Sequence, residues 1–112
     1  MDLTIVSTLN PVLQDTYYPG MPLVSCFASS DRRFKDNSVD MGTGFDCLSP
    51  WANTNSSKIS PEQMANRMIL VSLMAAHNFT NYDGEWWHYS LQGEPFPETY
   101  FDFPIQKDCC VV

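Results

Sequence analysis

The sequence has few basic residues and no long apolar run, and these two shortages exclude several functions. Only 6 Lys and Arg residues stand against 13 Asp and Glu residues, which gives the 112 residues a formal net charge of -7. Such a balance opposes binding to phosphate backbones and to anionic membrane surfaces. The longest apolar stretch, residues 68–76, is interrupted by Ser72 and is shorter than the roughly 18 residues that a membrane span needs. We therefore expect neither nucleic acid nor a membrane as a partner.

The first residues also lack an export signal. A secretory signal peptide has a basic start, an apolar middle and a small-residue cleavage site, and residues 1–20 contain none of these. The compartment stays open at this point. A periplasmic or secreted protein is expected if a longer N-terminus carries a signal, and a cytoplasmic protein otherwise.

Cysteine is sparse, with four residues at positions 26, 47, 109 and 110. Their spacing matches neither a zinc ribbon nor a C-x-x-C redox pair. We interpret Cys26 and Cys47 as a disulfide that closes a loop, which would suit an oxidising compartment. Two buried free thiols are the alternative.

The content of 44% hydrophobic and 13% aromatic residues is typical of a packed globular chain, and 112 residues allow one domain. Residues 1–9 alternate apolar and polar side chains and predict a strand. Residues 10–38 are rich in Pro, Gly, Ser and Asp and predict a long loop excursion. Residues 38–46 contain two glycines and predict a bent segment. Residues 105–112 are expected to form a tail.

The strongest local signal is the start of a helix. Ser60 suits the N-cap, Pro61 suits the first helical position, and Gln63 completes a capping box. A helix is therefore predicted over residues 61–77. Its apolar face is predicted from residues that recur at three- and four-residue spacing: Met64, Met68, Val71 and Ala75, joined by Ala65, Ile69 and Ser72.

The chain after this helix is punctuated by turn and strand signals. Asp83 and Gly84 precede aromatic residues and predict a turn. Residues 85–91 are aromatic-rich and predict a strand. Residues 94–104 hold three prolines among four aromatic residues, which predicts an extended segment packed on the core.

Glu85 and His88 place a carboxylate and an imidazole three residues apart in an aromatic setting. A zinc ion held by His nitrogen and carboxylate oxygen keeps one position for water and lowers the pKa of that water toward about 7. A nearby Glu that is not a ligand can then accept the proton. The tetrapeptide alone leaves a structural, salt-linked pair as the alternative. Residues three apart on a flat strand point to opposite faces, so a shared site requires a bulge or a turn before Glu85.

Four sequence blocks favour the zinc interpretation: M-D-L-T-I-V, M-G-T-G-F-D, E-W-W-H-Y and E-P-F-P-E-T-Y-F-D-F-P. In this order they resemble the end of the VanX-type D-alanyl-D-alanine dipeptidases, most specifically over residues 85–104. The resemblance implies an α+β fold in which a small antiparallel sheet packs on a helix, shared with other D,D-peptidases and hedgehog signalling domains. It does not cover the first half of the family, so the N-terminal half of the family fold is expected to be missing.

The resemblance also assigns the residues of a zinc site. Asp2 and His88 match two of the three protein ligands of one zinc ion, and Glu85 matches the general base. The third ligand, a His, and an Arg that supports the transition state would lie before residue 1. A solvated terminal residue is the alternative for Asp2. His77 does not occupy a family position and is expected near the helix C-terminus.

Three further residues are assigned to the substrate. Asp46 matches an acidic residue that receives the free ammonium group of the dipeptide, and a simple turn residue is its alternative. Trp86 and Trp87 are assigned to the wall of the substrate pocket, and burial in the core is their alternative.

The resemblance implies zinc-dependent hydrolysis of D-alanyl-D-alanine, a cell-wall precursor. Glu85 would deprotonate zinc-bound water and return the proton to the departing amine. With two of three ligands, the polypeptide alone is expected to bind zinc weakly and to be inactive. Two alternatives are a peptidase that cuts another D,D- or L,D-muropeptide bond and a non-catalytic binding module of the same fold. The sequence predicts no oligomeric state.

Overall fold

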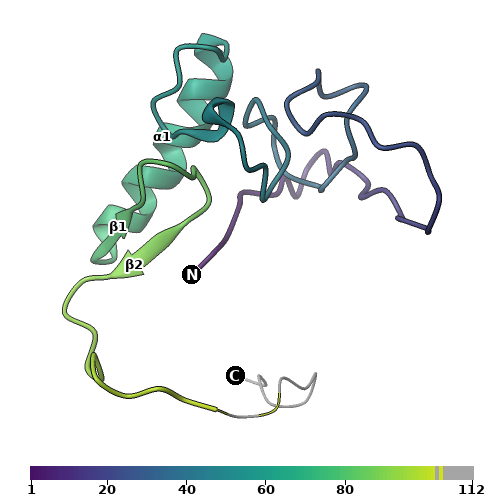
Figure 1. The fold of residues 1–112 in the computed structure, drawn as a ribbon. Helices are drawn as coiled ribbons and strands as arrows, with labels where there is room; N and C mark the ends of the chain where they lie inside the picture. The colour runs from purple at the N-terminus through teal and green to yellow at the C-terminus, as the bar shows by residue number, and fades with distance from the viewer. Residues whose placement is uncertain (103, 105–112) are drawn as a thin grey trace.

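The computed structural model of the protein describes residues 1–102 and 104, so the predicted tail at residues 105–112 lies outside the described residues. The elements are η1 (Pro50–Ala52), α1 (Pro61–Ala76), β1 (Phe79–Asn81) and β2 (Tyr89–Leu91). Helix α1 packs along the hairpin of β1 and β2 (Figure 1). The predicted α+β class is confirmed. No helix within the described residues has the length and apolar character to cross a membrane.

Helix α1 begins where the sequence predicts. The Ser60 hydroxyl accepts a 3.2 Å hydrogen bond from the Gln63 amide, and the Gln63 side chain accepts a 2.9 Å bond from the Ser60 amide. These reciprocal bonds satisfy two donors that a helix N-terminus leaves free. The helix ends at Ala76, and His77 is its C-cap. The predicted end is thus one residue too long.

The buried face of α1 differs from the predicted one. Arg67, Leu70 and Met74 are its buried residues. Four residues predicted to face the core are exposed instead: Ala65, Ile69, Ser72 and Ala75. The helix is rotated because Arg67 inserts its guanidinium among three carbonyl groups, which the apolar pattern could not indicate.

The strand predicted over residues 1–9 is wrong in extent. Asp2 forms an isolated antiparallel bridge with His88, supported by bonds from the Leu3 amide to the Trp87 carbonyl and from the Tyr89 amide to the Met1 carbonyl. Residues 1–3 therefore lie beside the start of β2. Farther along, Ile5 accepts one bond from Val39, and residues 6–9 belong to no strand because no partner strand is in place beside them.

Strands β1 and β2 pair antiparallel, with Phe79 opposite Leu91 and Asn81 opposite Tyr89. Residues 82–88 link them. This hairpin and the bridge at Asp2 form the small antiparallel sheet on which α1 rests. The strand predicted over residues 85–91 is therefore shorter than expected.

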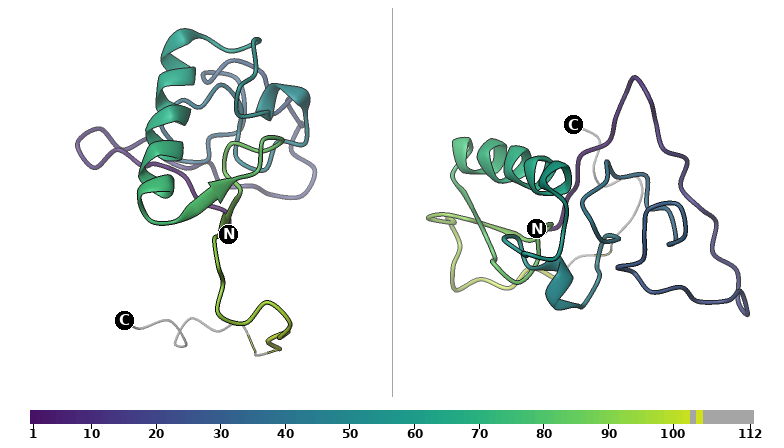
Figure 2. Two further views of the ribbon diagram at one scale, coloured as in Figure 1. Left: turned by 90° about the vertical axis from the view of Figure 1, so that its left-hand side faces the viewer. Right: turned by 90° about the horizontal axis from the view of Figure 1, so that it is seen from above.

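Residues 10–38 form a long loop excursion without helix or strand, as predicted. Figure 2 shows that this loop extends away from α1 and the hairpin. A disulfide joins Cys26 to Cys47, whose Cα atoms lie 5.5 Å apart. The Gly44 amide also donates a 2.7 Å bond to the Cys26 carbonyl. The excursion is thus attached to the segment that carries Phe45 and Asp46.

The core lies where this segment, α1 and the hairpin meet, and its buried hydrophobic residues are Met41, Cys47, Ala52, Leu70, Met74, Trp86, Trp87 and Tyr89. Residues 94–102 do not join it. They are exposed throughout, and the rings of Phe96 and Phe101 pack edge to face on each other, 5.6 Å apart. The prediction that this segment packs on the core is therefore wrong for residues 94–102.

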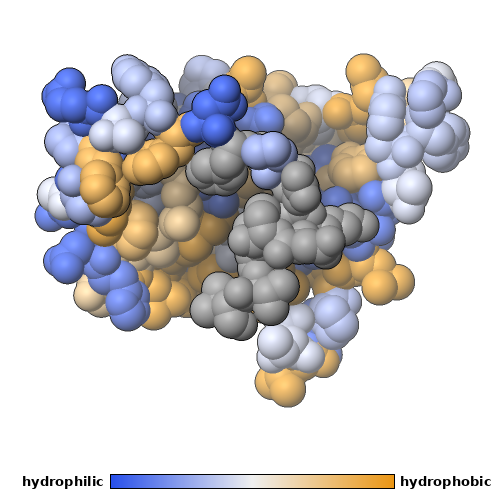
Figure 3. All heavy atoms as spheres, turned by 90° about the horizontal axis from the view of Figure 1, so that it is seen from below, coloured by the Kyte–Doolittle hydropathy of each residue, from blue (hydrophilic) through white to orange (hydrophobic). Residues whose placement is uncertain are grey.

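Much apolar surface stays uncovered. Several leucines are more than 80% exposed, namely Leu9, Leu13, Leu23 and Leu48. Figure 3 shows apolar residues spread over the face seen from below. Scattered exposed apolar residues are ordinary, but this number in a chain of 112 residues leaves the core small relative to the surface.

Candidate active site

The link between β1 and β2 places Glu85 and His88 on a turn. The Glu85 amide donates a 3.0 Å bond to the Tyr82 carbonyl, and the His88 amide donates a 3.2 Å bond to the Glu85 carbonyl. A turn closes over residues 85–88, so the two side chains are not held on opposite faces of a flat strand. This geometry resolves the conflict that the three-residue spacing raised.

Asp2, Glu85 and His88 meet around one imidazole nitrogen. The Nδ1 atom of His88 lies 2.9 Å from Oδ1 of Asp2 and 3.5 Å from Oε2 of Glu85. The side chains are 49%, 28% and 39% exposed for Asp2, Glu85 and His88 respectively. The site is therefore open to solvent on one side and has a nitrogen and two carboxylates at contact distance.

Trp86 fixes the turn from within the core. Its backbone amide donates a 3.1 Å bond to the Ala52 carbonyl, and its indole nitrogen donates a 2.8 Å bond to the Thr43 hydroxyl. Trp86 and Trp87 are 0% and 1% exposed, and their rings pack edge to face. The structure thus places both indoles in the core, which was the alternative for them, and their assignment to the wall of the substrate pocket stays a prediction.

Asp46 is exposed and lies in the neighbouring loop. Its φ of 58° is in the left-handed region, which non-glycine residues rarely adopt. The preceding residue, Phe45, packs its ring 6.1 Å from Trp86 and 5.8 Å from Trp87. Among the described residues, no hydrogen bond or ion pair joins the Asp46 carboxylate to Asp2, Glu85 or His88. The structure therefore brings Asp2 and Glu85 into contact with His88. The loop that carries Asp46 packs on the neighbouring tryptophans without a direct contact of its carboxylate to these three residues.

Asp40 organises the start of this loop. Its carboxylate accepts bonds from Arg33 at 2.9 Å, from Gln63 at 2.9 Å and from the Gly42 amide at 3.0 Å. Burial acts to raise the pKa of Asp40, but hydrogen bonds from Arg33, Gln63 and Gly42 outweigh burial, and the pKa lies below its usual value. The carboxylate therefore ties the excursion and α1 to one loop.

Arg67 holds two loops together from α1. Its guanidinium donates to the carbonyl groups of Met41 at 2.8 Å, Asn53 at 2.7 Å and Trp51 at 3.0 Å. Burial lowers the pKa of Arg67 to about 10, while the charge of Asp40 acts in the opposite direction. Arg67 is therefore still a cation near neutral pH, and its charge is compensated by carbonyl dipoles.

The contacting side chains fit a zinc ion as part of a ligand set. Two ligands about 2.0 to 2.2 Å from a tetrahedral zinc lie roughly 3.3 Å apart, close to the 2.9 Å between His88 and Asp2. Imidazole nitrogen and carboxylate oxygen are ordinary zinc donors. Within residues 1–102 and 104, however, no group of three or more His, Cys, Asp or Glu side chains is arranged to hold a metal. A third protein ligand is therefore not identified in this part of the chain.

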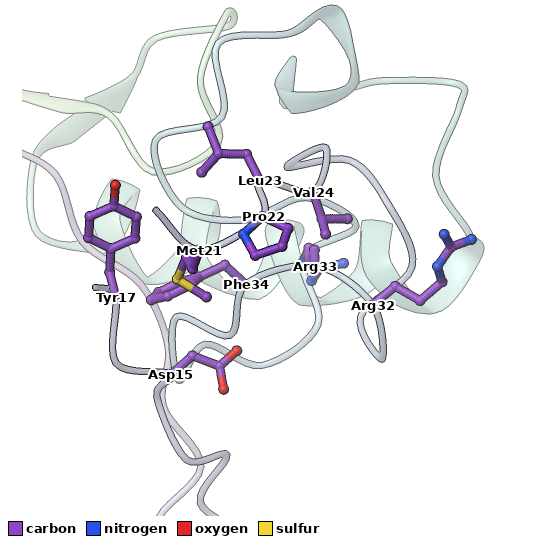
Figure 4. Close-up of a pocket in the computed structure, with 9 residues that line it drawn as sticks. All are labelled: Asp15, Tyr17, Met21, Pro22, Leu23, Val24, Arg32, Arg33 and Phe34. Atoms are coloured by element: carbon purple, nitrogen blue, oxygen red, sulfur yellow. The ribbon is translucent and has the colours of Figure 1, made fainter. Parts of the chain in front are cut away.

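A separate hollow lies in the excursion, away from these residues. It has a volume of about 380 Å³ and is lined by Asp15, Tyr17, Met21, Pro22, Leu23, Val24, Arg32, Arg33 and Phe34. In Figure 4 the Arg32 side chain extends away from its apolar centre. The other arginine, Arg33, is already paired with Asp40. The third charged residue of the lining, Asp15, accepts a 2.8 Å hydrogen bond from the Lys35 amide, and most of the other lining side chains are apolar.

Sequence reasoning missed two residues that shape the site. Asn81 resembled part of a turn signal, and its side chain instead donates to the carbonyl groups of Glu85 and His88. Arg67 was not singled out at all. The available signal was its spacing to Leu70 and Met74, which places a charge on the buried stripe of α1.

Comparison with known proteins identifies the family. Residues 24–106 match the family described as D-ala-D-ala dipeptidase. The D-alanyl-D-alanine dipeptidase of Streptomyces coelicolor is 48% identical over 65 residues, covering 58% of this chain and 32% of the relative. That of Enterococcus faecium is 41% identical over 68 residues, covering 61% and 34%. That of Escherichia coli is 32% identical over 62 residues, covering 54% and 32%.

The chain spans about a third of the length of these curated relatives. The matched family region nevertheless contains Asp46, Glu85 and His88 and covers most of the chain, whereas Asp2 precedes it. The chain therefore belongs to the D-alanyl-D-alanine dipeptidase family of peptidases.

Proposed function

We propose that this chain carries part of the catalytic machinery of a zinc-dependent D-alanyl-D-alanine dipeptidase. The observation that carries the proposal is the contact of Asp2, Glu85 and His88 around one imidazole nitrogen. Family membership supports the reaction, because several relatives are named for hydrolysis of this dipeptide.

His88 and Asp2 would hold the zinc ion, supplying one nitrogen and one oxygen donor. The ion supplies Lewis acidity, which polarises a carbonyl group and makes water more acidic. The backbone bridge between the two residues keeps these donors adjacent without help from a metal. This preformed arrangement reduces the entropy that ligand ordering would otherwise cost.

Glu85 would act as the general base and then as the general acid. Its side chain is 28% exposed, less than those of Asp2 and His88, and its carboxylate lies 3.5 Å from the same nitrogen. It would accept a proton from the attacking water and deliver it to the departing amine, so the same oxygen serves both halves of the reaction. The exposed Asp46, in the loop packed on Trp86 and Trp87, would receive the ammonium group of the substrate.

The test compares two polypeptides for release of D-alanine from D-alanyl-D-alanine with added zinc. One is the 112-residue chain, and the other joins it to the region of the Streptomyces coelicolor relative that lies outside the alignment. We expect turnover from the joined protein and none above background from the 112-residue chain, because two protein ligands bind zinc much more weakly than three. L-alanyl-L-alanine is the matched control substrate.

Glu85→Gln in the joined protein gives the decisive comparison, because it keeps the size of the side chain and removes the base. Turnover equal to that of the parent would refute the role of Glu85. Cleavage of a longer D,D- or L,D-muropeptide in place of the dipeptide would replace the proposed substrate while retaining the zinc chemistry. Failure of the joined protein to cleave any of these peptides would favour a non-catalytic binding module.

We also propose that the chain works in an oxidising compartment, periplasmic or extracellular. The Cys26–Cys47 disulfide supports this, because such bonds persist mainly outside the reducing cytosol. Thiol labelling of protein taken directly from its native cells tests it. Full labelling of Cys26 and Cys47 without prior reduction would refute the proposal.

A further inference from the structure

We propose that Asn81, anchored by Thr54, is the positioning residue that holds Glu85 and His88 on one side of their turn. The inference rests on the proposed roles of Glu85 and His88 for its functional meaning. Its geometric content stands on contacts that involve neither zinc nor substrate.

The Asn81 side chain brackets the two ends of the turn. Its amide nitrogen donates a 3.0 Å bond to the Glu85 carbonyl and a second 3.0 Å bond to the His88 carbonyl. One planar NH₂ group thus fixes the separation of the two backbone positions that carry the base and the ligand. The Tyr82 amide adds a 2.9 Å bond to the same His88 carbonyl.

Thr54 anchors the oxygen end of the Asn81 amide. Its hydroxyl donates a 2.5 Å bond to the Asn81 side-chain oxygen, and Thr54 is only 3% exposed. With the amide reversed, its oxygen would face two carbonyl groups that can only accept, so these carbonyl groups select the observed orientation. The Thr54 hydroxyl then donates to the opposite end of the amide and holds the side chain in the position that brackets the turn.

Thr54 also connects this bracket to the body of the fold. Its backbone amide donates a 2.9 Å bond to the Asp83 carbonyl, so it holds the start of the turn directly. The preceding residue, Asn53, gives its carbonyl to buried Arg67. A continuous set of bonds therefore runs from α1 through Thr54 and Asn81 to Glu85 and His88.

Without the bracket, the Glu85 and His88 carbonyl groups would each lose a donor in a partly buried setting. An extended backbone over residues 85–88 is then the competing conformation, and it would direct the two side chains to opposite faces. The amide of Asn81 is therefore expected to control the contact between Glu85 and His88, and not only the stability of the hairpin.

The test uses three variants of the 112-residue chain, each examined by NMR without metal. Asn81→Asp keeps the shape and removes both donors. Thr54→Val keeps the shape and removes the anchoring hydroxyl, whereas Thr54→Ser retains a hydroxyl as the matched control. The readouts are the exchange rate of the His88 amide and the imidazole signals of His88, which sense Asp2 at 2.9 Å and the Tyr82 ring at 5.8 Å.

In Asn81→Asp and Thr54→Val we expect shifted His88 imidazole signals and His88 amide exchange about tenfold faster. The Leu70 amide in the middle of α1, a reporter of global unfolding, should change much less, and Thr54→Ser should resemble the parent. Unchanged His88 signals in folded Thr54→Val, or equal acceleration at His88 and Leu70, would overturn the proposal. If Asn81→Asp does not fold, the comparison of Thr54→Val with Thr54→Ser still tests the proposal. Because no zinc or peptide is present, failure of the proposed reaction would leave this result interpretable.

Discussion

The carbonyl oxygen of Met41 accepts a 2.8 Å hydrogen bond from Nε of Arg67, a charged side chain that α1 buries completely. Two further carbonyl groups, from Trp51 and Asn53, complete the set around the guanidinium. The loops that supply these carbonyls also hold Trp86, one through the Thr43 hydroxyl and the other through the Ala52 carbonyl. The position of Trp86, and hence of the turn that carries it, depends on Arg67.

Replacing Arg67 with Met should lower the free energy of unfolding by about 3 kcal/mol, because one buried and two partly buried carbonyl groups lose their donors at once. Urea denaturation followed by tryptophan fluorescence measures this. Arg67→Lys is the informative companion variant, since one ammonium group cannot reproduce the planar fork of donors and should recover only part of the loss. A loss below about 1 kcal/mol for Arg67→Met would show that the loops are held by other contacts.

Asp40 should make the free energy of unfolding depend on pH. Hydrogen bonds from Arg33, Gln63 and Gly42 outweigh the opposing effect of burial and hold the pKa of Asp40 below its ordinary 3.8. A carboxylate with a lowered folded-state pKa contributes stability above its unfolded-state value and loses it as pH falls through the folded-state value. The parent should therefore exceed Asp40→Asn in stability at neutral pH, and this difference should shrink below about pH 4.

Urea unfolding of both proteins between pH 2 and pH 7 measures this difference. Asp83→Asn removes a carboxylate from the exposed turn and controls for the change in net charge. A constant difference between the parent and Asp40→Asn across the whole range would contradict the prediction.

The Cys26–Cys47 disulfide should raise the free energy of unfolding of the whole protein. The bridge spans a sequence separation of 21 residues, and a closed loop of that size is expected to contribute about 3 kcal/mol by restricting the unfolded chain. Thermal unfolding of Cys26→Ala/Cys47→Ala against the oxidised parent tests this value. Adding a reductant to the double variant controls for effects on Cys109 and Cys110, and the prediction is wrong if oxidised parent and double variant unfold alike.

Features set by local sequence were the ones that could be predicted. The capping box of Ser60 and Gln63 involves bonds across three residues, so the start of α1 followed directly from the sequence. The absence of regular structure in residues 10–38 followed equally from their composition. The contact between Asp2 and His88 was predicted from family resemblance and not from periodicity, because the two residues lie near opposite ends of the chain.

Features that depend on distant contacts were not predictable. The spacing of Arg67 to Leu70 and Met74 could place it on the buried stripe of α1, but arginine is rarely buried, and no pattern in α1 indicated the three carbonyl acceptors from other loops. The strand signal over residues 85–91 was overridden by Asn81 and by the core contacts of Trp86, which close a turn instead. In both cases a polar side chain and a remote backbone group decided the local conformation.

Tyr89→Phe should stabilise the protein or leave its stability unchanged. The Tyr89 hydroxyl is buried and has no hydrogen-bond partner among the described residues, and burial raises the pKa of Tyr89 to about 12. An unsatisfied buried hydroxyl is unfavourable by about 1–3 kcal/mol, so its removal without loss of ring volume should gain up to that amount. Denaturation in urea at pH 7 checks the sign. A clear loss of stability would contradict the prediction.

Zinc binding by the 112-residue chain should be weak and should depend on His88 alone of the two histidines. The Nδ1 atom of His88 faces Asp2 at 2.9 Å, whereas His77 is the exposed C-cap of α1. Two protein donors leave the remaining zinc positions to water, so the affinity should fall far below that of a site with three protein ligands. Isothermal titration with zinc at pH 7 measures it. We expect His88→Ala to abolish the binding, Asp2→Asn to weaken it, and His77→Ala, the matched control, to leave it unchanged. Binding that survives His88→Ala but is lost in His77→Ala would move the metal to the end of α1 and remove the support for a zinc-dependent role of the turn.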